Sequence, residues 1–137
     1  MHIFAPYAHA IATLALWGLW MIYLSVQSNT GLTPEDRTES GHPKRDYASQ
    51  PYRRNRAFQN AIETSPAFLA TTTAAILAGA SPVSVNWLAT LFLLARVIMA
   101  FVHIRTENQP LRSAMFGIGW LMIILMAVLA LYTVFLG

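Results

Sequence analysis

The feature that most constrains this chain is a set of four long apolar stretches, at residues 3–26, 57–80, 83–104 and 111–136. A helix of about 20 residues crosses the roughly 30 Å hydrocarbon core of a bilayer, and each stretch is long enough for that. Apolar residues make up 55% of the 137 residues and charged residues 11%, which lies outside the usual balance of a soluble domain. The sequence therefore predicts an all-α integral membrane protein, a four-helix bundle that forms one domain over residues 1–137.

The ends of the predicted helices follow from the residues that flank these stretches. The first stretch has no basic segment before it and is longer than the apolar part of a signal peptide, about 7 to 15 residues. We therefore interpret it as a retained helix. Pro51 fits the first turn of the second helix, which would then begin before its apolar part. The predicted helices cover about 3–26, 52–80, 83–104 and 111–136.

The segment 27–51, between the first two helices, is long for a connection without structure of its own. Within it, Thr33 is a candidate N-cap and is followed by a proline at the first helical position and by two acids in the first turn. We expect a short helix there.

Lys and Arg gather on one side of the predicted bundle. The loops after the first and third helices, with the adjoining helix starts, contain Arg37, Lys44, Arg45, Arg53, Arg54, Arg56, Arg105 and Arg112. By the positive-inside rule, both loops face the cytoplasm and both termini lie on the other side. No basic stripe runs along a soluble segment, which argues against nucleic acid as a partner. The chain has no cysteine, so any thiol chemistry must use a thiol that a ligand supplies.

Three polar residues share one face at the start of the second helix. Arg56, Asn60 and Glu63 occupy positions i, i+4 and i+7, which places them together at its cytoplasmic end. An arginine at a membrane boundary is ordinary, so Arg56 has a purely structural alternative. Asn60 and Glu63 lie deeper, where a polar group that faces lipid is costly and needs a partner.

Arg96 is the most unusual residue, because it lies roughly 12 Å inside the end of the third helix at about 1.5 Å per residue. Such a charge needs a countercharge or water. Glu63 is the only acid in the membrane segments and is the predicted partner in an ion pair with Arg96, whose role is either structural or functional. His103 follows Arg96 by seven residues and shares its face, as a ligand contact or as a bystander.

Arg112 and Ser113 lie in the segment that opens the fourth helix. Free backbone N–H groups and the positive end of the helix dipole attract anions there, and they add to the charge of the arginine. The pair therefore predicts a site for a carboxylate or thiolate, with a role as a topological anchor as the alternative for Arg112. The histidines at positions 2, 9 and 42 show no metal-ligand spacing, and no metal site is expected.

These residues, in this order and with this helix count, resemble the MAPEG superfamily, the membrane-associated proteins of eicosanoid and glutathione metabolism. The segment RNRAFQNAIETSPAF looks like the family's helix-two pattern of arginine, asparagine and glutamate, followed by proline with an aromatic. The segment RVIMAFVHIRTENQPLRSAMF looks like its helix-three arginine, followed by the proline, arginine and serine that open helix four. The pattern is closest to the short bacterial members, which favours a bacterial inner membrane over an endoplasmic reticulum.

The resemblance implies a homotrimer that binds glutathione between neighbouring subunits near the cytoplasmic face. Carried over by position, the site has a catalytic pair that stabilises the thiolate and lies beside the sulfur, and a set that binds the rest of the cosubstrate. The catalytic pair is Arg112 and Ser113, and the binding set is Arg56, Asn60, Glu63, His103 and Arg96. Eicosanoid-type members commonly have tyrosines where this chain has Met99, His103 and Phe116.

Two functions remain open on the sequence. The first is a membrane glutathione transferase or peroxidase that acts on lipophilic electrophiles entering from the bilayer. The alternative is a non-enzymatic membrane protein of the same fold that binds lipid or another anionic ligand. A small four-helix drug exporter is disfavoured, because such exporters carry a glutamate within helix one and this chain has no acid there.

Overall fold

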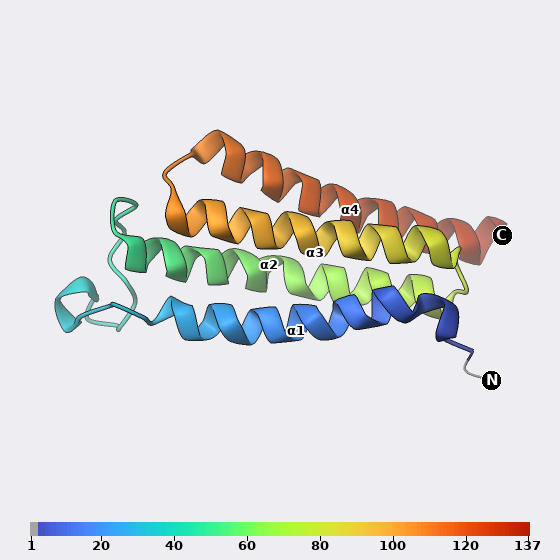
Figure 1. The fold of residues 1–137 in the computed structure, drawn as a ribbon, viewed down its shortest axis with the longest axis horizontal. Helices are drawn as coiled ribbons and strands as arrows, with labels where there is room; N and C mark the ends of the chain where they lie inside the picture. Colours follow the sequence, from blue (N-terminus) through green and yellow to red (C-terminus); the bar gives the residue numbers. More distant parts are fainter. Residues whose placement is uncertain (1–2) are drawn as a thin grey trace.

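A computed structural model describes residues 3–137, and all regular elements in this range are helices. The four α-helices are α1 (Ala8–Ser28), α2 (Gln50–Leu77), α3 (Pro82–Arg105) and α4 (Gln109–Leu136), and two short 3-10 helices are η1 (Ala5–Tyr7) and η2 (Pro34–Asp36). The α-helices run side by side along the long axis, with α1 and α4 on opposite sides of α2 and α3 (Figure 1). The predicted all-α bundle of four helices is confirmed.

Three segments are long and apolar enough to cross a membrane, namely Ala5–Ser28, Pro82–Arg105 and Gln109–Leu136. The second helix, α2, does not reach that hydropathy, because arginines fill its first turns and Asn60, Glu63 and several threonines follow. Its crossing of the membrane therefore stays a prediction. α2 packs against each of the other three helices, and its Thr64 and Thr72 are fully buried between them. Neighbouring helices thus surround much of the polar content of α2.

The two ends of the bundle differ in what they contain (Figure 1). One end, which we call the loop end, has the long α1–α2 connection (residues 29–49) and the α3–α4 connection (residues 106–108). The other, the terminal end, has both chain termini and the α2–α3 turn, where Gly79 adopts a positive φ of 73° that favours glycine. The two basic loops therefore meet at one end, as the charge pattern predicts.

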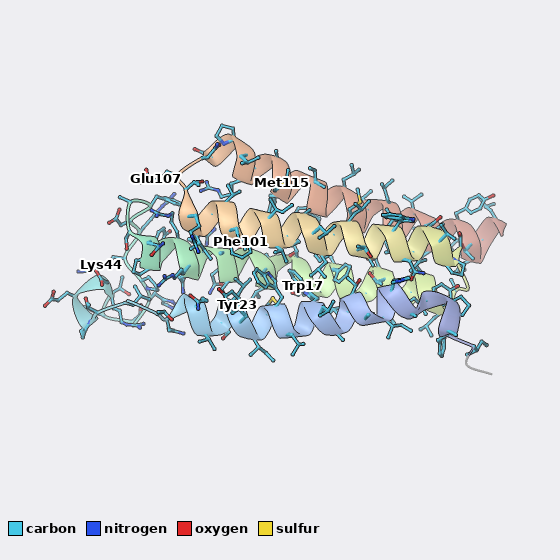
Figure 2. The ribbon with its side chains drawn as sticks, viewed as in Figure 1. Trp17, Tyr23, Lys44, Phe101, Glu107 and Met115 are labelled. Carbon is cyan, nitrogen blue, oxygen red and sulfur yellow. The ribbon has the colours of Figure 1, made fainter. Side chains whose placement is uncertain are left out.

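The core of the bundle is built around three aromatic rings from three helices. Phe68 and Phe92 stack with their centroids 3.8 Å apart, and Trp17 meets Phe92 edge-on at 5.0 Å. Trp17 Nε1 donates a hydrogen bond of 2.9 Å to Ser65 Oγ, so the polar edge of its ring is also satisfied. Figure 2 shows Trp17 between the helices, whereas many side chains of α1 and α4 point outward. Those outward side chains are largely Leu, Ile, Val and Phe, which suits a lipid surface.

The α1–α2 connection is ordered by local hydrogen bonds. The expected short helix is present as η2, where Asp36 Oδ2 accepts bonds from the Thr33 N–H at 2.9 Å and the Thr33 hydroxyl at 2.8 Å. These donors hold the pKa of Asp36 below its ordinary value. α2 then begins one residue before Pro51, with Ser49 as its N-cap. The early start of this helix is therefore confirmed.

Candidate functional site

The loop end contains a cavity of about 220 Å³ between α2, α3, α4 and the α1–α2 connection. We call it the inner cavity. Of the seven residues expected to form a site, five line it: Arg56, Asn60, His103, Arg112 and Ser113. Its other walls are Tyr47, Met99 and Phe116. The fold therefore brings residues from three helices together, although the sequence pattern relates only those within each helix.

Asn60 and His103 form the wall between α2 and α3. The Asn60 Nδ2 atom lies 3.4 Å from His103 Nδ1, which is a long contact for a hydrogen bond. His103 is almost fully buried, and its Nε2 atom has no hydrogen-bond partner within residues 3–137. A buried polar atom without a partner is costly, and such atoms are common where a ligand completes the bonding.

Arg96 lies beside the inner cavity, with only 1% of its surface exposed. Its Nη2 donates a bond of 2.6 Å to the Asn60 carbonyl, and its Nη1 contacts Met99 Sδ at 3.2 Å. The guanidinium carbon lies 5.2 Å from the centroid of the Phe116 ring, in a cation–π arrangement. Arg96 thus touches three residues that line the cavity without lining it itself, and its Nε has no bonding partner in the described part of the chain.

The predicted ion pair between Arg96 and Glu63 is wrong. Within residues 3–137 the one ion pair joins Arg53 Nη1 to Glu107 Oε1 at 3.8 Å. Glu63 is exposed on the outer side of α2 and does not line the inner cavity. The rotation of α2 explains the difference, because Ala61 and Thr64 of the same helical turn face the core and leave Glu63 pointing outward.

Close approach of α4 fixes Arg96 from the opposite side. Gly119 is buried, and a Cβ atom added there would lie 2.8 Å from Arg96 Cδ. Any larger residue at this position would have to displace the arginine side chain. The glycine therefore leaves room for a large cationic side chain inside the bundle.

Arg112 enters the inner cavity from the first turns of α4, but the backbone there is already satisfied. The Leu111 N–H donates to Asn108 Oδ1 at 3.0 Å, and the Arg112 N–H donates to the Asn108 carbonyl at 3.2 Å. The expectation of free backbone N–H groups at this helix start is thus wrong at these two residues, because Asn108 caps them. Attraction for an anion at this point comes from the guanidinium and the helix dipole.

Tyr47, in the α1–α2 connection, is a cavity residue that the sequence reasoning missed. Its ring lies 5.3 Å from the Arg112 guanidinium carbon, and it stacks on His103 with centroids 6.4 Å apart. The available signal was an aromatic residue inside a basic segment, KRDYASQPYRR. Nothing in that pattern relates Tyr47 to residues on α3 and α4.

A second cavity, of about 370 Å³, adjoins the inner one at the loop end. We call it the outer cavity, and it is lined by Arg45, Tyr47, Arg53, Glu107, Gln109 and Arg112. Tyr47 and Arg112 line both cavities. Figure 2 shows Glu107 in the α3–α4 connection, at the end of the bundle where Lys44 also lies. The outer cavity therefore opens among the charged loops.

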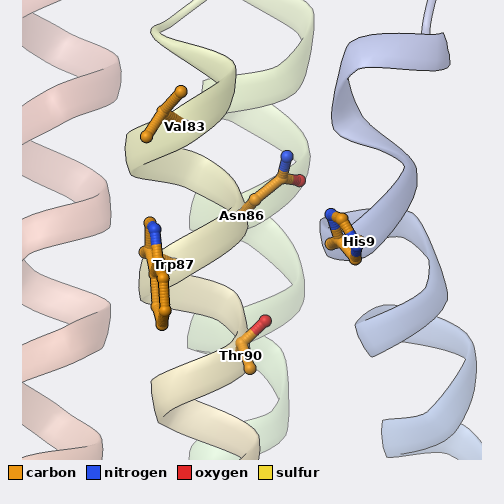
Figure 3. A pocket seen from close by; sticks show the side chains of 5 residues that line it. All are labelled: His9, Val83, Asn86, Trp87 and Thr90. Carbon is orange, nitrogen blue, oxygen red and sulfur yellow. The ribbon is translucent and has the colours of Figure 1, made fainter.

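A further cavity of about 370 Å³ lies near the terminal end, between α1 and α3 (Figure 3). Asn86 projects from α3 toward α1, where its Nδ2 donates to the Pro6 carbonyl and its Oδ1 accepts from the Ala10 N–H, both at 2.9 Å. His9 and Trp87 at its edge are exposed, and none of the seven predicted site residues lines it. The expected site residues thus gather at the opposite end of the molecule.

Comparison with known proteins agrees with the helix count and the residue pattern. The family model described as the MAPEG family matches residues 7–132, nearly the whole chain. This range includes every residue that lines the inner cavity. No curated protein matches the chain.

Proposed function

We propose that this chain, which belongs to the MAPEG family, is a membrane glutathione transferase or peroxidase that uses its inner cavity to activate a glutathione thiolate. The family is one of integral membrane proteins that generally use glutathione, and its members include glutathione transferases. The substrate is a lipophilic electrophile that reaches the site from the bilayer.

One observation carries the proposal, namely the joining of Arg112 with Asn60, His103 and Arg56 around a single cavity. A free thiol has a pKa of about 8.5 and is largely protonated at neutral pH. Lowering that pKa by about two units, worth about 2.7 kcal/mol, ionises most of the bound thiol. In this proposal the Arg112 guanidinium supplies the positive charge, and Ser113, which lines the same cavity, donates its hydroxyl to the sulfur.

The other polar groups serve binding of the cosubstrate. Arg56 and the Asn60 amide offer donors to the carboxylates and peptide groups of the tripeptide. His103 has a buried nitrogen that lacks a protein partner in the range described, and a bound ligand can complete it. Arg96 does not line the cavity, but it donates a hydrogen bond to the Asn60 carbonyl and keeps positive charge beside the cavity.

The dimensions and the surface of one chain support a site shared between subunits of a homotrimer. Ligand sites usually have about 300–1,000 Å³, more than the inner cavity of one chain offers. Glu63 points out of the bundle on α2, where a charge facing lipid is costly, and Ala70 and Ala74 continue the same exposed face. A neighbouring subunit packed on this face would bury Glu63 and bring it to the site of that neighbour.

The same proposal places the loop end in the cytoplasm and both termini on the far side, most simply in a bacterial inner membrane. A tag at either terminus should then be inaccessible from the cytoplasm, and a tag near Gly41 should be accessible. Gly41 is an exposed turn residue with a positive φ of 83°, so an insertion beside it disturbs no helix. Termini that label from the cytoplasm would reverse the orientation.

The deciding experiment measures the bound thiol in purified protein. Calorimetry in detergent gives the affinity for glutathione, and ultraviolet difference spectra against pH give its thiolate, with S-methylglutathione as a ligand that has no ionisable thiol. Arg112→Ala should move the thiol titration upward by about one unit or more and lower turnover more than binding. Asn60→Ala should weaken binding and leave the titration unchanged.

Binding of glutathione without a thiolate signal at pH 7 would contradict the proposal, and so would an Arg112 variant that titrates like the wild type. In either case the non-enzymatic reading, in which the cavity binds lipid or another anion, becomes the better one. Vesicles with anionic lipid would then be the ligand to measure.

A further inference from the structure

Tyr47 lies in the α1–α2 connection, outside the helices, and yet it contacts residues of three of them. Its ring packs edge-on against Tyr52 with centroids 5.2 Å apart, stacks on His103 of α3, and lies under the Arg112 guanidinium of α4. It also forms the shared wall of the inner and outer cavities. One residue of the α1–α2 connection therefore touches three of the four α-helices at the loop end.

Arg53 fixes this part of the connection. It is 8% exposed, and its Nη1 donates to the carbonyls of Tyr47 and Ala48 at 2.7 and 2.8 Å. Its Nε donates to the Ile104 carbonyl at 3.2 Å, near the end of α3. Charged donors on backbone carbonyls are among the stronger hydrogen bonds in proteins. The position of Tyr47 is thus set by a buried arginine that joins α2, α3 and the connection.

The Arg112 side chain, by contrast, is only half-buried, and between residues 3 and 137 its guanidinium has the contact with the Tyr47 ring but no hydrogen bond. A free guanidinium at the boundary of the two cavities has two directions to take. One leads into the inner cavity, and the other leads toward Glu107, a largely exposed carboxylate that lines the outer cavity and already lies 3.8 Å from Arg53 Nη1. An arginine paired with a carboxylate stabilises a thiolate less, because its charge is partly neutralised.

We propose that Tyr47 is a positioning residue for Arg112. The Tyr47 ring holds the Arg112 guanidinium at the inner cavity and away from Glu107. Guanidinium groups stack on aromatic faces, and such contacts are stronger where the pair is shielded from water. The ring face is the feature that matters, since in the part of the chain described the Tyr47 side chain makes its contacts through the ring and the residue accepts a hydrogen bond through its backbone carbonyl. The role of Tyr47 in thiolate activation rests on the proposed function, but its hold on Arg112 does not.

The test compares Tyr47→Leu with Tyr47→Phe, which keeps the ring. In Tyr47→Leu the titration of bound glutathione should move upward, and turnover should fall about three- to tenfold with a smaller change in the KM for glutathione. Tyr47→Phe should match the wild type in both. Adding Glu107→Gln to Tyr47→Leu removes the competing carboxylate, so it should restore part of the lost turnover and shift the titration back. Glu107→Gln alone also removes the ion pair with Arg53 and is the control for that loss.

A second measurement does not depend on activity. Phenylglyoxal modifies accessible arginines, and peptide mass spectrometry of the protein in detergent gives the rate at Arg112 itself. Tyr47→Leu should raise that rate at least threefold, while Tyr47→Phe leaves it unchanged. Arg54, whose guanidinium bonds to the Thr30 carbonyl and the Gln50 side chain, serves as the internal reference.

An unchanged modification rate of Arg112 in Tyr47→Leu would show that Tyr47 does not position Arg112, whatever the protein catalyses. An unchanged thiol titration, in a variant that still binds glutathione as a thiolate, would overturn the part of Tyr47 in activation and leave the proposed function intact. A wild type with no thiolate signal overturns the proposed function instead. The modification rate of Arg112 then remains as the test of whether Tyr47 positions it.

Discussion

Two asparagines at opposite ends of the bundle show how differently this molecule uses its polar groups. At the terminal end, Asn86 satisfies the Pro6 carbonyl and the Ala10 N–H, and the nearby Tyr7 hydroxyl donates to the Ala80 carbonyl at 2.5 Å. At the loop end, the Asn60 side chain has one long contact to His103. Polar groups at the terminal end join the helices to one another, whereas several at the loop end are left with bonding capacity for a ligand.

Arg53 is the structural exception at the loop end, and its loss should have the largest effect on folding. Arg53→Ala leaves three backbone carbonyls without their donor and frees the α1–α2 connection. We expect a loss of about 3 kcal/mol in the free energy of unfolding, measured by denaturant titration in detergent. Proteolysis within residues 29–49 should also become faster.

Arg54→Ala is the matched control, because the neighbouring arginine is less buried and, among residues 3–137, its side chain bonds only to the Thr30 carbonyl and the Gln50 side chain. It should cost less than about 1 kcal/mol. Equal losses in the two variants would mean that the burial of Arg53 does not anchor the connection.

The same substitution at the two asparagines should have opposite consequences. Asn86→Ala leaves the Pro6 carbonyl and the Ala10 N–H without partners and should lower stability by about 1–2 kcal/mol, with glutathione affinity unchanged. Asn60→Ala removes one weak contact and places a better helix former in α2, so stability should change by less than about 0.5 kcal/mol.

The order of the two variants should be reversed for glutathione affinity, because Asn60→Ala should weaken binding by about tenfold while Asn86→Ala leaves it unchanged. Thermal unfolding and calorimetry on the same two preparations give both quantities. The contrast between the two ends would not survive if Asn86→Ala impaired binding as much as Asn60→Ala did.

We expect the buried charge of Arg96 at the loop end to contribute little to the stability of the bundle. Arg96→Met fills a similar volume beside Gly119 and removes a cation that has no carboxylate partner in the described chain. The unfolding free energy should stay within about 1 kcal/mol of the wild type or rise, while binding of glutathione weakens severalfold. A loss of several kcal/mol would instead make Arg96 a structural residue like Arg53.

The smallest expected effect is the coupling between Arg96 and Glu63. In a double-mutant cycle of Arg96→Met and Glu63→Gln, the unfolding free energies of one chain in detergent should add within about 0.5 kcal/mol, because no ion pair joins the residues. A coupling of about 2 kcal/mol or more would show that the side chains meet after all.

Sequence periodicity predicted Asn60 and Arg56 correctly as neighbours but gave Glu63 the wrong surroundings. Residues at i and i+4 share a face of any helix, whatever it packs against, so both residues reach the inner cavity. Glu63 extends that face around the helix, and the rotation of α2 leaves it outside. The search for a countercharge to Arg96 failed for a related reason, since a backbone carbonyl and an aromatic face took that place.

The sequence by itself determined the class of fold, the meeting of the basic loops at one end and most of the cavity-lining residues, because apolar length and helical spacing are local properties of the chain. Only the tertiary structure decided the position of Tyr47, the capping of Leu111 by Asn108 and the partners of Arg96. The contacts of Tyr47 and Arg96 depend on the path of a connection and on the rotation of each helix about its axis. Both are set by packing among residues far apart in sequence, such as the rings of Trp17, Phe68 and Phe92.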